Sequence, residues 1–297
     1  MTNPFNKDLD QNPANYQPLT PITFLERAAS VFPDQIAVIH GNLRQNYSEL
    51  YRRSVKLASS LNKIGIKRGD TISVLLPNTP AMLEAHYGVP MSGAILHSIN
   101  TRLDASTISF QLNHAETKVF IIDSEYMALA QEALKSIDIK PIIIEYDDLE
   151  YLGKKEEFKS INYEEFIDQG DDAFNWLMPE NEWDAISINY TSGTTGHPKG
   201  VVTHHRGAYL LAQGNALTIS MPKHSIYLWT LPMFHCNGWC FPWTMSAISG
   251  THVCLRQVRA DKIWHLISEH KVSHLCGAPI VMSVIVNALQ SEKRKLN

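Results

Sequence analysis

Short apolar runs alternate with segments of helical periodicity from about residue 20 onward. The runs at 71–76, 119–122 and 141–144 are continuously apolar, which is typical of strands buried on both faces of a sheet. Between the first two runs, one helix is predicted to start at Thr79-Pro80 and a second to cover 104–114, with a strand at 94–99 between them. This alternation predicts an α/β fold with a mainly parallel sheet.

The first elements carry specific boundary signals. Thr23, with Glu26 three positions later, predicts a capping box at the start of a helix that ends near residue 32. The runs at 36–39 and 43–47 flank Gly41-Asn42 and predict a β-hairpin. We expect the following helix to begin at Ser48 and to stop at Gly65.

Residues 147–180 interrupt the alternation of strands and helices. The segment is rich in Asp and Glu and is punctuated by Gly and Pro, which is typical of a solvated connection. A short helix is predicted at 163–168. We expect this connection to separate a first α/β subdomain, about 19–180, from a second that begins at about 181, near Trp183.

A run of small and hydroxylic residues follows the strand-like stretch at 185–189. Glycines and hydroxyls allow backbone and side-chain donors to converge on an anion, and a lysine adds a compact positive charge. The run lacks the spacing of a P-loop, and Val201-Val202 after it is extended, so we predict strand–loop–strand rather than strand–loop–helix. The predicted polyphosphate-binding residues are Thr191, Ser192, Gly193, Thr194, Thr195, Gly196 and Lys199.

Two motifs resemble a known family. Residues 191–200, Thr-Ser-Gly-Thr-Thr-Gly-His-Pro-Lys-Gly, resemble the signature of the adenylate-forming (AMP-binding) enzymes. Residues 228–240 resemble the short- and medium-chain acyl-CoA ligase branch, which includes methylthiopropionate-CoA ligases. The resemblance runs from about residue 19 to the C-terminus. It implies the large N-terminal domain of that fold, over 19–297, built from two stacked, mainly parallel α/β subdomains.

The family's later segments are not found in the 297 residues. These are a glutamate that helps to hold magnesium, an aspartate that binds ribose, and a small C-terminal domain that carries a lysine. We therefore expect a truncated large domain without the small domain, and expect the chain to be inactive alone. The activity implied for the complete protein is an ATP-dependent acid–thiol ligase that forms an acyl-AMP and then an acyl-CoA.

The resemblance also implies roles for individual residues. The phosphate run would bind ATP, with Thr191 contributing to Mg²⁺ binding, and coenzyme A would be the second co-substrate. His235 would lie beside the acyl group as the catalytic-site histidine, although a buried structural histidine is the alternative. The remaining residues expected to shape the acyl site are Asn237, Trp239, Gly277, Ala278 and Pro279; Trp239 alternatively lies in the core, and Pro279 alternatively starts a plain helix.

Composition and charge bear on nucleic-acid binding, location in the cell and metal binding. The formal net charge of −4 gives no electrostatic reason to expect nucleic-acid binding. No apolar run is long enough to span a bilayer and the first ten residues lack signal-peptide character, so we predict a cytoplasmic protein. The four cysteines match no common zinc spacing, and we expect reduced thiols. Oligomeric state is not indicated.

Two alternatives to a ligase stay open on the residues alone. One is an ATP phosphotransferase that uses the same loop, and the other is a nucleotide-binding module without turnover. A reductase is disfavoured because no strand is followed by Gly-x-Gly-x-x-Gly. His197, His204 and His205 flank the loop, and we expect them not to contact nucleotide.

Overall fold

The computed structural model describes residues 3–191 and 198–296 and contains two β-sheets. The larger sheet has seven strands, parallel except for its last pair. Their spatial order is β7 (Ile161–Asn162), β6 (Ile142–Tyr146), β5 (Thr117–Asp123), β3 (Thr71–Leu75), β4 (Ile95–Ser98), β8 (Ala185–Thr191) and β9 (Lys199–His204).

The smaller sheet has five strands, and only its β1–β2 pair is antiparallel. Their order is β12 (His274–Leu275), β10 (Ile226–Leu228), β11 (Thr251–Val253), β1 (Ile36–His40) and β2 (Leu43–Asn46). The β1–β2 pair is the hairpin expected around Gly41-Asn42. The fold class, two stacked and mainly parallel α/β units, is confirmed.

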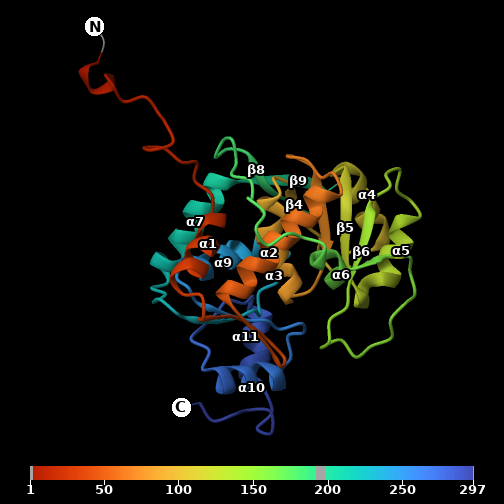
Figure 1. The fold of residues 1–297 in the computed structure, drawn as a ribbon. Coiled ribbons are helices and arrows are strands. Elements are labelled where there is room, and N and C mark those ends of the chain that lie inside the picture. Colours follow the sequence, from red (N-terminus) through yellow and green to blue (C-terminus); the bar gives the residue numbers. More distant parts are fainter. Residues whose placement is uncertain (1–2, 192–197, 297) are drawn as a thin grey trace.

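Helices separate and cover the two sheets (Figure 1). One apolar cluster joins facing sides of both sheets to the central helices α1 (Ile22–Val31), α2 (Tyr47–Lys63), α3 (Pro80–Met91) and α9 (Phe241–Ala247). A second packs α4 (Ala105–His114) and α5 (Met127–Leu134) on the outer face of the seven-stranded sheet. A third packs α10 (Ala260–His270) and α11 (Pro279–Val286) on the outer face of the five-stranded sheet.

Five further helices complete the described elements. They are the 3₁₀ helices η1 (Pro4–Asn6) and η2 (Ser124–Tyr126), and helices α6 (Tyr163–Asp168), α7 (His205–Thr218) and α8 (Cys236–Trp239). Helix α6 confirms the short helix expected inside the acidic connection. Among the described helices, none combines the length and the apolar character needed to cross a bilayer.

Two helix starts differ from the expectation. Helix α1 begins at Ile22 with Pro21 at its N-cap and no capping side chain, so the Thr23–Glu26 capping box is wrong. Helix α2 begins at Tyr47 and is capped by Asn46, whose side chain accepts a hydrogen bond from the Glu49 amide. The Glu49 carboxylate accepts one from the Asn46 amide in return. The capping box therefore lies two residues before the predicted cap, Ser48.

The division between the sheets does not follow the sequence boundary expected near residue 180. Strands β8 and β9 complete the seven-stranded sheet, because β8 pairs in parallel with β4. Strand β1 pairs with β11 and so joins the five-stranded sheet. Each sheet therefore contains strands from both sides of the acidic connection, and neither forms from one contiguous half of the chain.

Candidate active site

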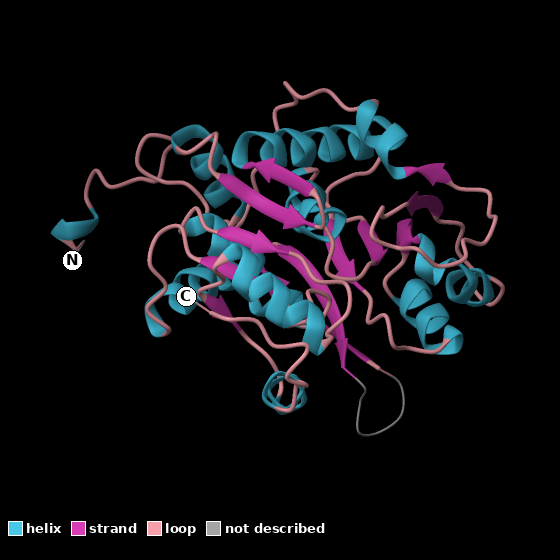
Figure 2. Cartoon of the chain, turned by 90° about the horizontal axis from the view of Figure 1, so that it is seen from below, coloured by secondary structure: helices cyan, strands magenta, loops and turns pink. Residues whose placement is uncertain are grey.

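A β-hairpin at the edge of the seven-stranded sheet brings two predicted phosphate ligands together. Strands β8 and β9 are antiparallel, and Thr191 is the direct partner of Lys199 across the ladder. Opposite residues of such a pair project to the same face with Cβ atoms about 5 Å apart. Both side chains are exposed. The pair therefore presents a hydroxyl and an ammonium side by side, and Figure 2 shows the two strands running alongside each other.

The strand–loop–strand prediction is confirmed by this hairpin. The predicted ligands Ser192, Gly193, Thr194, Thr195 and Gly196 lie outside the described residues, as does His197. Thr191 is the last described residue before that run, and Lys199 is the second described residue after it.

The segment 229–235 is fixed against the carboxyl ends of three strands of the seven-stranded sheet. After β3, the Asn78 amide donates to the carbonyl oxygens of Trp229 (2.8 Å) and Leu231 (3.0 Å) and accepts from the Met233 amide (2.8 Å). At the ends of β4 and β8, Ser98 Oγ and Asn189 Nδ2 both donate to the Phe234 carbonyl, at 3.1 Å each. His235 therefore follows a backbone position tied to the strand that carries Thr191.

These three anchoring residues were not identified from the sequence. Each is a small polar residue at or just beyond the end of an apolar strand, and carboxyl ends of parallel strands are where ligand contacts gather. That position was the available signal. This signal was weak because polar residues also occur at the ends of strands simply where those ends are exposed to solvent.

His235 is exposed, and its role remains a prediction. It occupies the N-cap position of α8 rather than the end of strand β10, which stops at Leu228. Its Nε2 lies 3.9 Å from Sγ of Cys236. A buried structural histidine, the alternative considered from the sequence, does not describe this exposed side chain.

The residues after His235 form an unusual left-handed run. Backbone φ is positive at five successive positions, 236–240, with values from 49° to 63°, and only one of the five is glycine. Left-handed conformation costs an L-residue about 1–2 kcal/mol. Strain of this kind persists where surrounding structure enforces it, commonly at functional sites.

Two of the predicted acyl-site residues lie within this run and differ in exposure. Asn237 is 1% exposed, and its Nδ2 donates to Ser187 Oγ of β8 at 2.6 Å. Trp239 is 51% exposed, so the alternative that it belongs to the core is wrong. Its carbonyl oxygen accepts a hydrogen bond from Asn215 of α7 at 2.8 Å. The run is thus tied to the sheet at one residue and presents an indole ring to the outside at another.

The predicted acyl-wall segment lies after β12. Thr230 Oγ1 donates to the Cys276 carbonyl at 2.8 Å, which joins the ends of β10 and β12 directly before Gly277. A Cβ at Gly277 would stand 2.8 Å from Val281 Cβ, so a larger residue is disfavoured there. Ala278 and Pro279 are exposed, and Pro279 starts α11, as the simpler expectation for this proline stated. A role in an acyl wall stays a prediction.

The histidines at the junction of β9 and α7 have structural partners. His204 caps α7 by accepting a hydrogen bond from the Gly207 amide at 2.8 Å. His205 Nδ1 lies 2.8 Å from Thr20 Oγ1, and burial lowers the pKa of His205 to about 4. Both therefore have roles that need no nucleotide. Across the described residues, no group of three or more His, Cys, Asp or Glu side chains is arranged to hold a metal ion, and all four cysteines are free thiols.

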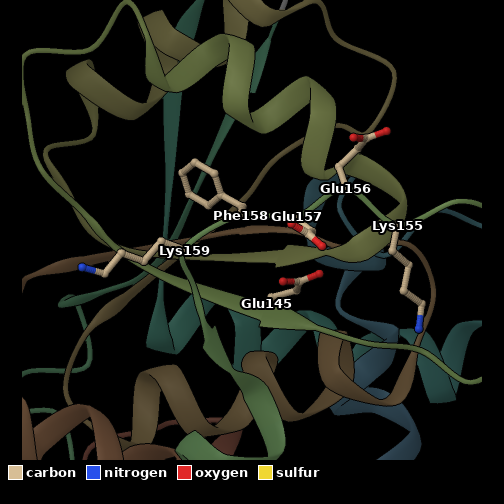
Figure 3. Close-up of a pocket in the computed structure, with 6 residues that line it drawn as sticks. All are labelled: Glu145, Lys155, Glu156, Glu157, Phe158 and Lys159. Atoms are coloured by element: carbon tan, nitrogen blue, oxygen red, sulfur yellow. The ribbon is translucent and has the colours of Figure 1, made fainter.

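Two surface recesses lie away from this site. One, of about 620 Å³, is lined by Glu145 and by residues 155–159 (Figure 3). Figure 3 shows acidic and basic side chains interspersed around it, which favours no single ligand charge. The other, of about 260 Å³, includes Asp70, His114 and Lys118 near the amino ends of strands. None of the predicted site residues lines either recess.

Comparison with known proteins identifies the family of this fold and site. A family model described as AMP-binding enzyme matches residues 25–297. The chain is 46% identical over 292 residues to the "Acetate/butyrate--CoA ligase AAE7, peroxisomal" of Arabidopsis thaliana, covering 95% of this chain and 51% of that protein. It is 44% identical over 295 residues to the "2-methylpropanoate--CoA ligase CCL4" of Humulus lupulus, covering 97% and 53%.

Solved structures agree with this assignment. The N-terminal domain of FACL13 from Mycobacterium tuberculosis superposes with a TM-score of 0.78 at 25% identity, over 91% of this chain and 65% of that one. An anthranilate CoA ligase, AuaEII, in complex with anthranoyl-AMP superposes with a TM-score of 0.82 at 19% identity, over 95% and 54%, and supports the fold alone. The chain spans about half the length of the curated relatives it matches, and a small C-terminal domain in the whole protein stays a prediction. The chain belongs to the AMP-binding enzyme family.

Proposed function

We propose that the whole protein is an ATP-dependent carboxylic acid–CoA ligase that acts on short- or medium-chain acids, fatty or thioether. The family match over residues 25–297 supports the reaction class. The single structural observation that carries the proposal is the placement of Thr191 opposite Lys199 on the hairpin whose sheet also anchors the segment leading to His235. This arrangement brings the Thr191–Lys199 pair and the segment that leads to His235 to one edge of the sheet, which supports the proposal that they bind phosphate and acid side by side.

The proposed reaction has two steps. A carboxylate oxygen of the acid attacks the α-phosphorus of ATP, the bond to the pyrophosphate oxygen breaks, and an acyl-adenylate forms. The thiol sulfur of coenzyme A then attacks the acyl carbonyl carbon, the bond to the AMP oxygen breaks, and a thioester forms while the thiol proton leaves to solvent. Positioning and charge neutralisation are the main tasks of the protein in such chemistry.

Lys199 is suited to the first step. Its exposed ammonium and the Thr191 hydroxyl face the same side of the hairpin. A charge pair 4 Å apart at an effective dielectric of 20 interacts with about 4 kcal/mol before desolvation is subtracted. The ammonium would offset the negative charge of the pyrophosphate as it leaves.

His235 and the left-handed run after it are suited to binding the acid. The exposed side chains of His235 and Trp239 lie on a backbone held by Asn237 at β8 and by Phe234 at β4 and β8. Gly277, Ala278 and Pro279 would border the same space, since Thr230 and Cys276 join the two segments.

Magnesium fits the site only in company with the nucleotide. The Thr191 hydroxyl offers one hard oxygen ligand, and Mg²⁺ in such sites is commonly held by one or two protein oxygens, substrate phosphates and water. Among the described residues no carboxylate group is arranged to complete a protein cage. When bound, the ion would neutralise phosphate charge, and Thr191 is the residue we propose as its protein ligand.

Substitution of Lys199 tests the proposal in the whole protein. Lys199→Ala should slow acyl-adenylate formation by about tenfold to a thousandfold, because a charge-stabilising group at the transition state is lost. It should slow thioester formation from supplied acyl-adenylate much less, since pyrophosphate is absent from that step. Lys135→Ala, which removes an exposed ammonium at the C-cap of α5, is the matched control and should change neither rate.

Product analysis separates the proposal from its alternatives. Acid-dependent release of AMP and pyrophosphate supports the ligase, whereas ADP and phosphate would identify a phosphotransferase. ATP binding without turnover would identify a nucleotide-binding module. Residence in the cytoplasm is part of the proposal, and the peroxisomal labels of some relatives make fractionation of cells the appropriate measurement.

A further inference from the structure

The two sheets are tied together at the carboxyl ends of successive strands. Asn78 after β3 binds the backbone after β10, as described above. Beside it, Arg256 after β11 binds Asp123 at the end of β5. One strand further along each sheet, His40 at the end of β1 binds Asp148 after β6. The links follow the strand order of both sheets, so the edge that carries the candidate site continues as a row of inter-sheet contacts.

Arg256 is the centre of this row. Its Nη1 donates to Asp123 Oδ2 at 2.8 Å and to Asp148 Oδ2 at 2.5 Å, and its Nη2 donates to Asp123 Oδ1 at 2.9 Å and Glu125 Oε2 at 2.6 Å. The side chains of Arg256, Asp123 and Asp148 are 8%, 0% and 2% exposed. One guanidinium therefore bridges three carboxylates from the seven-stranded side. A lysine ammonium cannot reproduce this planar fork.

The ionisation of the cluster agrees with its geometry. Burial opposes the charged forms, yet hydrogen bonds and charge from His40 and Arg256 lower the pKa of Asp148 to about 2. Burial raises the pKa of Asp123, with Arg256 acting in the opposite direction. Removing the guanidinium would leave buried carboxylates without a partner, a strongly destabilising change.

A short path leads from Arg256 to the candidate site. Val253, three residues before Arg256, pairs with Leu228 across β11 and β10. The Trp229 amide donates to the Val253 carbonyl at 2.9 Å, and Trp229 begins the segment that ends at His235. Trp229 Nε1 also donates to His252 Nδ1 of β11 at 3.0 Å. The position of β11 along the sheet edge thus determines where residues 229–235 meet Asn78, Ser98 and Asn189.

We propose that Arg256 is a positioning residue for the acid-activating site, which it serves by holding the carboxyl end of β11 against β5 and β6. The guanidinium contacts no reacting group. It fixes the alignment of the two sheet edges, and through β11 and β10 it fixes residues 229–235 and the side chain of His235. The expected change in KM rests on the proposed function. The expected change in the backbone of residues 229–235 does not.

The structural consequence is tested by amide hydrogen exchange on the whole protein. Arg256→Lys keeps the charge and loses the fork. We expect exchange of the peptide covering 229–235 to accelerate about tenfold, which corresponds to about 1.4 kcal/mol. Glu125→Gln, at a partner that is 23% exposed, removes a single charged contact and gives a folded second variant, with a smaller acceleration of the same peptide expected.

The matched control is another arginine, 21% exposed, that bridges two carboxylates and joins helices instead of sheets. Arg53 of α2 binds Glu84 of α3 at 2.5 Å and Glu164 of α6 at 2.8 Å. Arg53→Lys should lower the melting temperature by an amount similar to Arg256→Lys. It should leave exchange of 229–235 unchanged relative to the rest of the chain.

Kinetics give a second, separate readout. Arg256→Lys should raise KM for the acid more than KM for ATP, since the displaced segment carries His235 and not Lys199. Lower stability with unchanged exchange of 229–235 and unchanged KM values would overturn the proposal. If the unsubstituted protein activates no acid, the proposed function fails, while accelerated exchange in Arg256→Lys but not in Arg53→Lys would still support the positioning role of Arg256.

Discussion

Replacing Gly238 by alanine perturbs the left-handed run at two levels. The backbone φ of Gly238 is 56°, a conformation that an alanine adopts only with strain. A Cβ at this position would stand 2.7 Å from Cζ3 and 2.9 Å from Cη2 of Trp229. Trp229 is fully buried and is held through its indole nitrogen by His252, so the ring has little freedom to move away.

The expected loss of stability is the sum of the backbone strain and the steric contact with Trp229. Left-handed backbone costs an L-residue about 1–2 kcal/mol. Forcing an extra methyl group into a packed interior costs typically about 1–3 kcal/mol. We therefore expect Gly238→Ala to lower the free energy of unfolding by about 2–5 kcal/mol, a large share of the total for a protein of this kind.

Two other glycines separate the contributions. Gly65 has φ of 90° and no atom within 4 Å of a built Cβ, so Gly65→Ala should show the backbone contribution alone, about 1–2 kcal/mol. Gly214 lies inside helix α7, also with no atom within 4 Å, and Gly214→Ala should stabilise by about 0.5–1 kcal/mol. Urea unfolding followed by circular dichroism measures all three.

The free energies of unfolding of the three variants test this explanation. If Gly238→Ala unfolds within 0.5 kcal/mol of the unsubstituted protein, a typical surface effect, then the run is neither left-handed nor packed on Trp229 as described. If it matches Gly65→Ala, the contact with Trp229 contributes nothing. Either result would also remove the rigid backbone on which the acyl-site proposal depends.

Three further predictions concern pH, the acid and an anchoring amide. Burial lowers the pKa of His97 and of His252 to about 3, so below pH 6.5 the unfolded state binds protons that the folded state does not. As the pH falls from 6.5 toward 3, the free energy of unfolding should therefore decrease by up to about 1.4 kcal/mol per pH unit for each histidine. His97→Gln should make urea unfolding less pH-dependent. His235→Ala should change the preference between short and longer acids without weakening ATP binding, whereas an unchanged preference in an acid panel would refute the site assignment. Asn78→Leu leaves three backbone groups unpaired, two of them buried and one partly buried, and should lower the free energy of unfolding by at least about 3 kcal/mol, measured by urea unfolding.

The local structure was predictable where period and turn chemistry determine it. Alternation over 185–189 and the extended Val201-Val202 correctly predicted the two strands β8 and β9, one on each side of the loop. The alternation of apolar and polar residues carries no information about which strands pair with each other, so β8 was assigned to the wrong sheet. The capping box at Asn46 was missed because Ser48 offers the same chemistry two residues later.

The candidate site was predictable only where a motif marks it. Thr191 and Lys199 belong to such a motif, and the hairpin does place them together. The left-handed run had no sequence signal beyond Asn237-Gly238, since cysteine and tryptophan normally adopt negative φ. The Arg256 cluster joins side chains from residue 40 to residue 256, and only the folded topology brings them within hydrogen-bonding distance.

The interleaving of the two sheets has a consequence for synthesis on the ribosome. The hydrogen bond from Thr251 Oγ1 to the Ile36 carbonyl joins residues 215 positions apart, at the place where β11 pairs with β1. At about 5–20 residues per second, about 11–43 s pass between the emergence of β1 and that of its partner. During that interval the β1–β2 hairpin has no sheet to join, and its apolar side chains are available to chaperones or to the same hairpin on a neighbouring nascent chain.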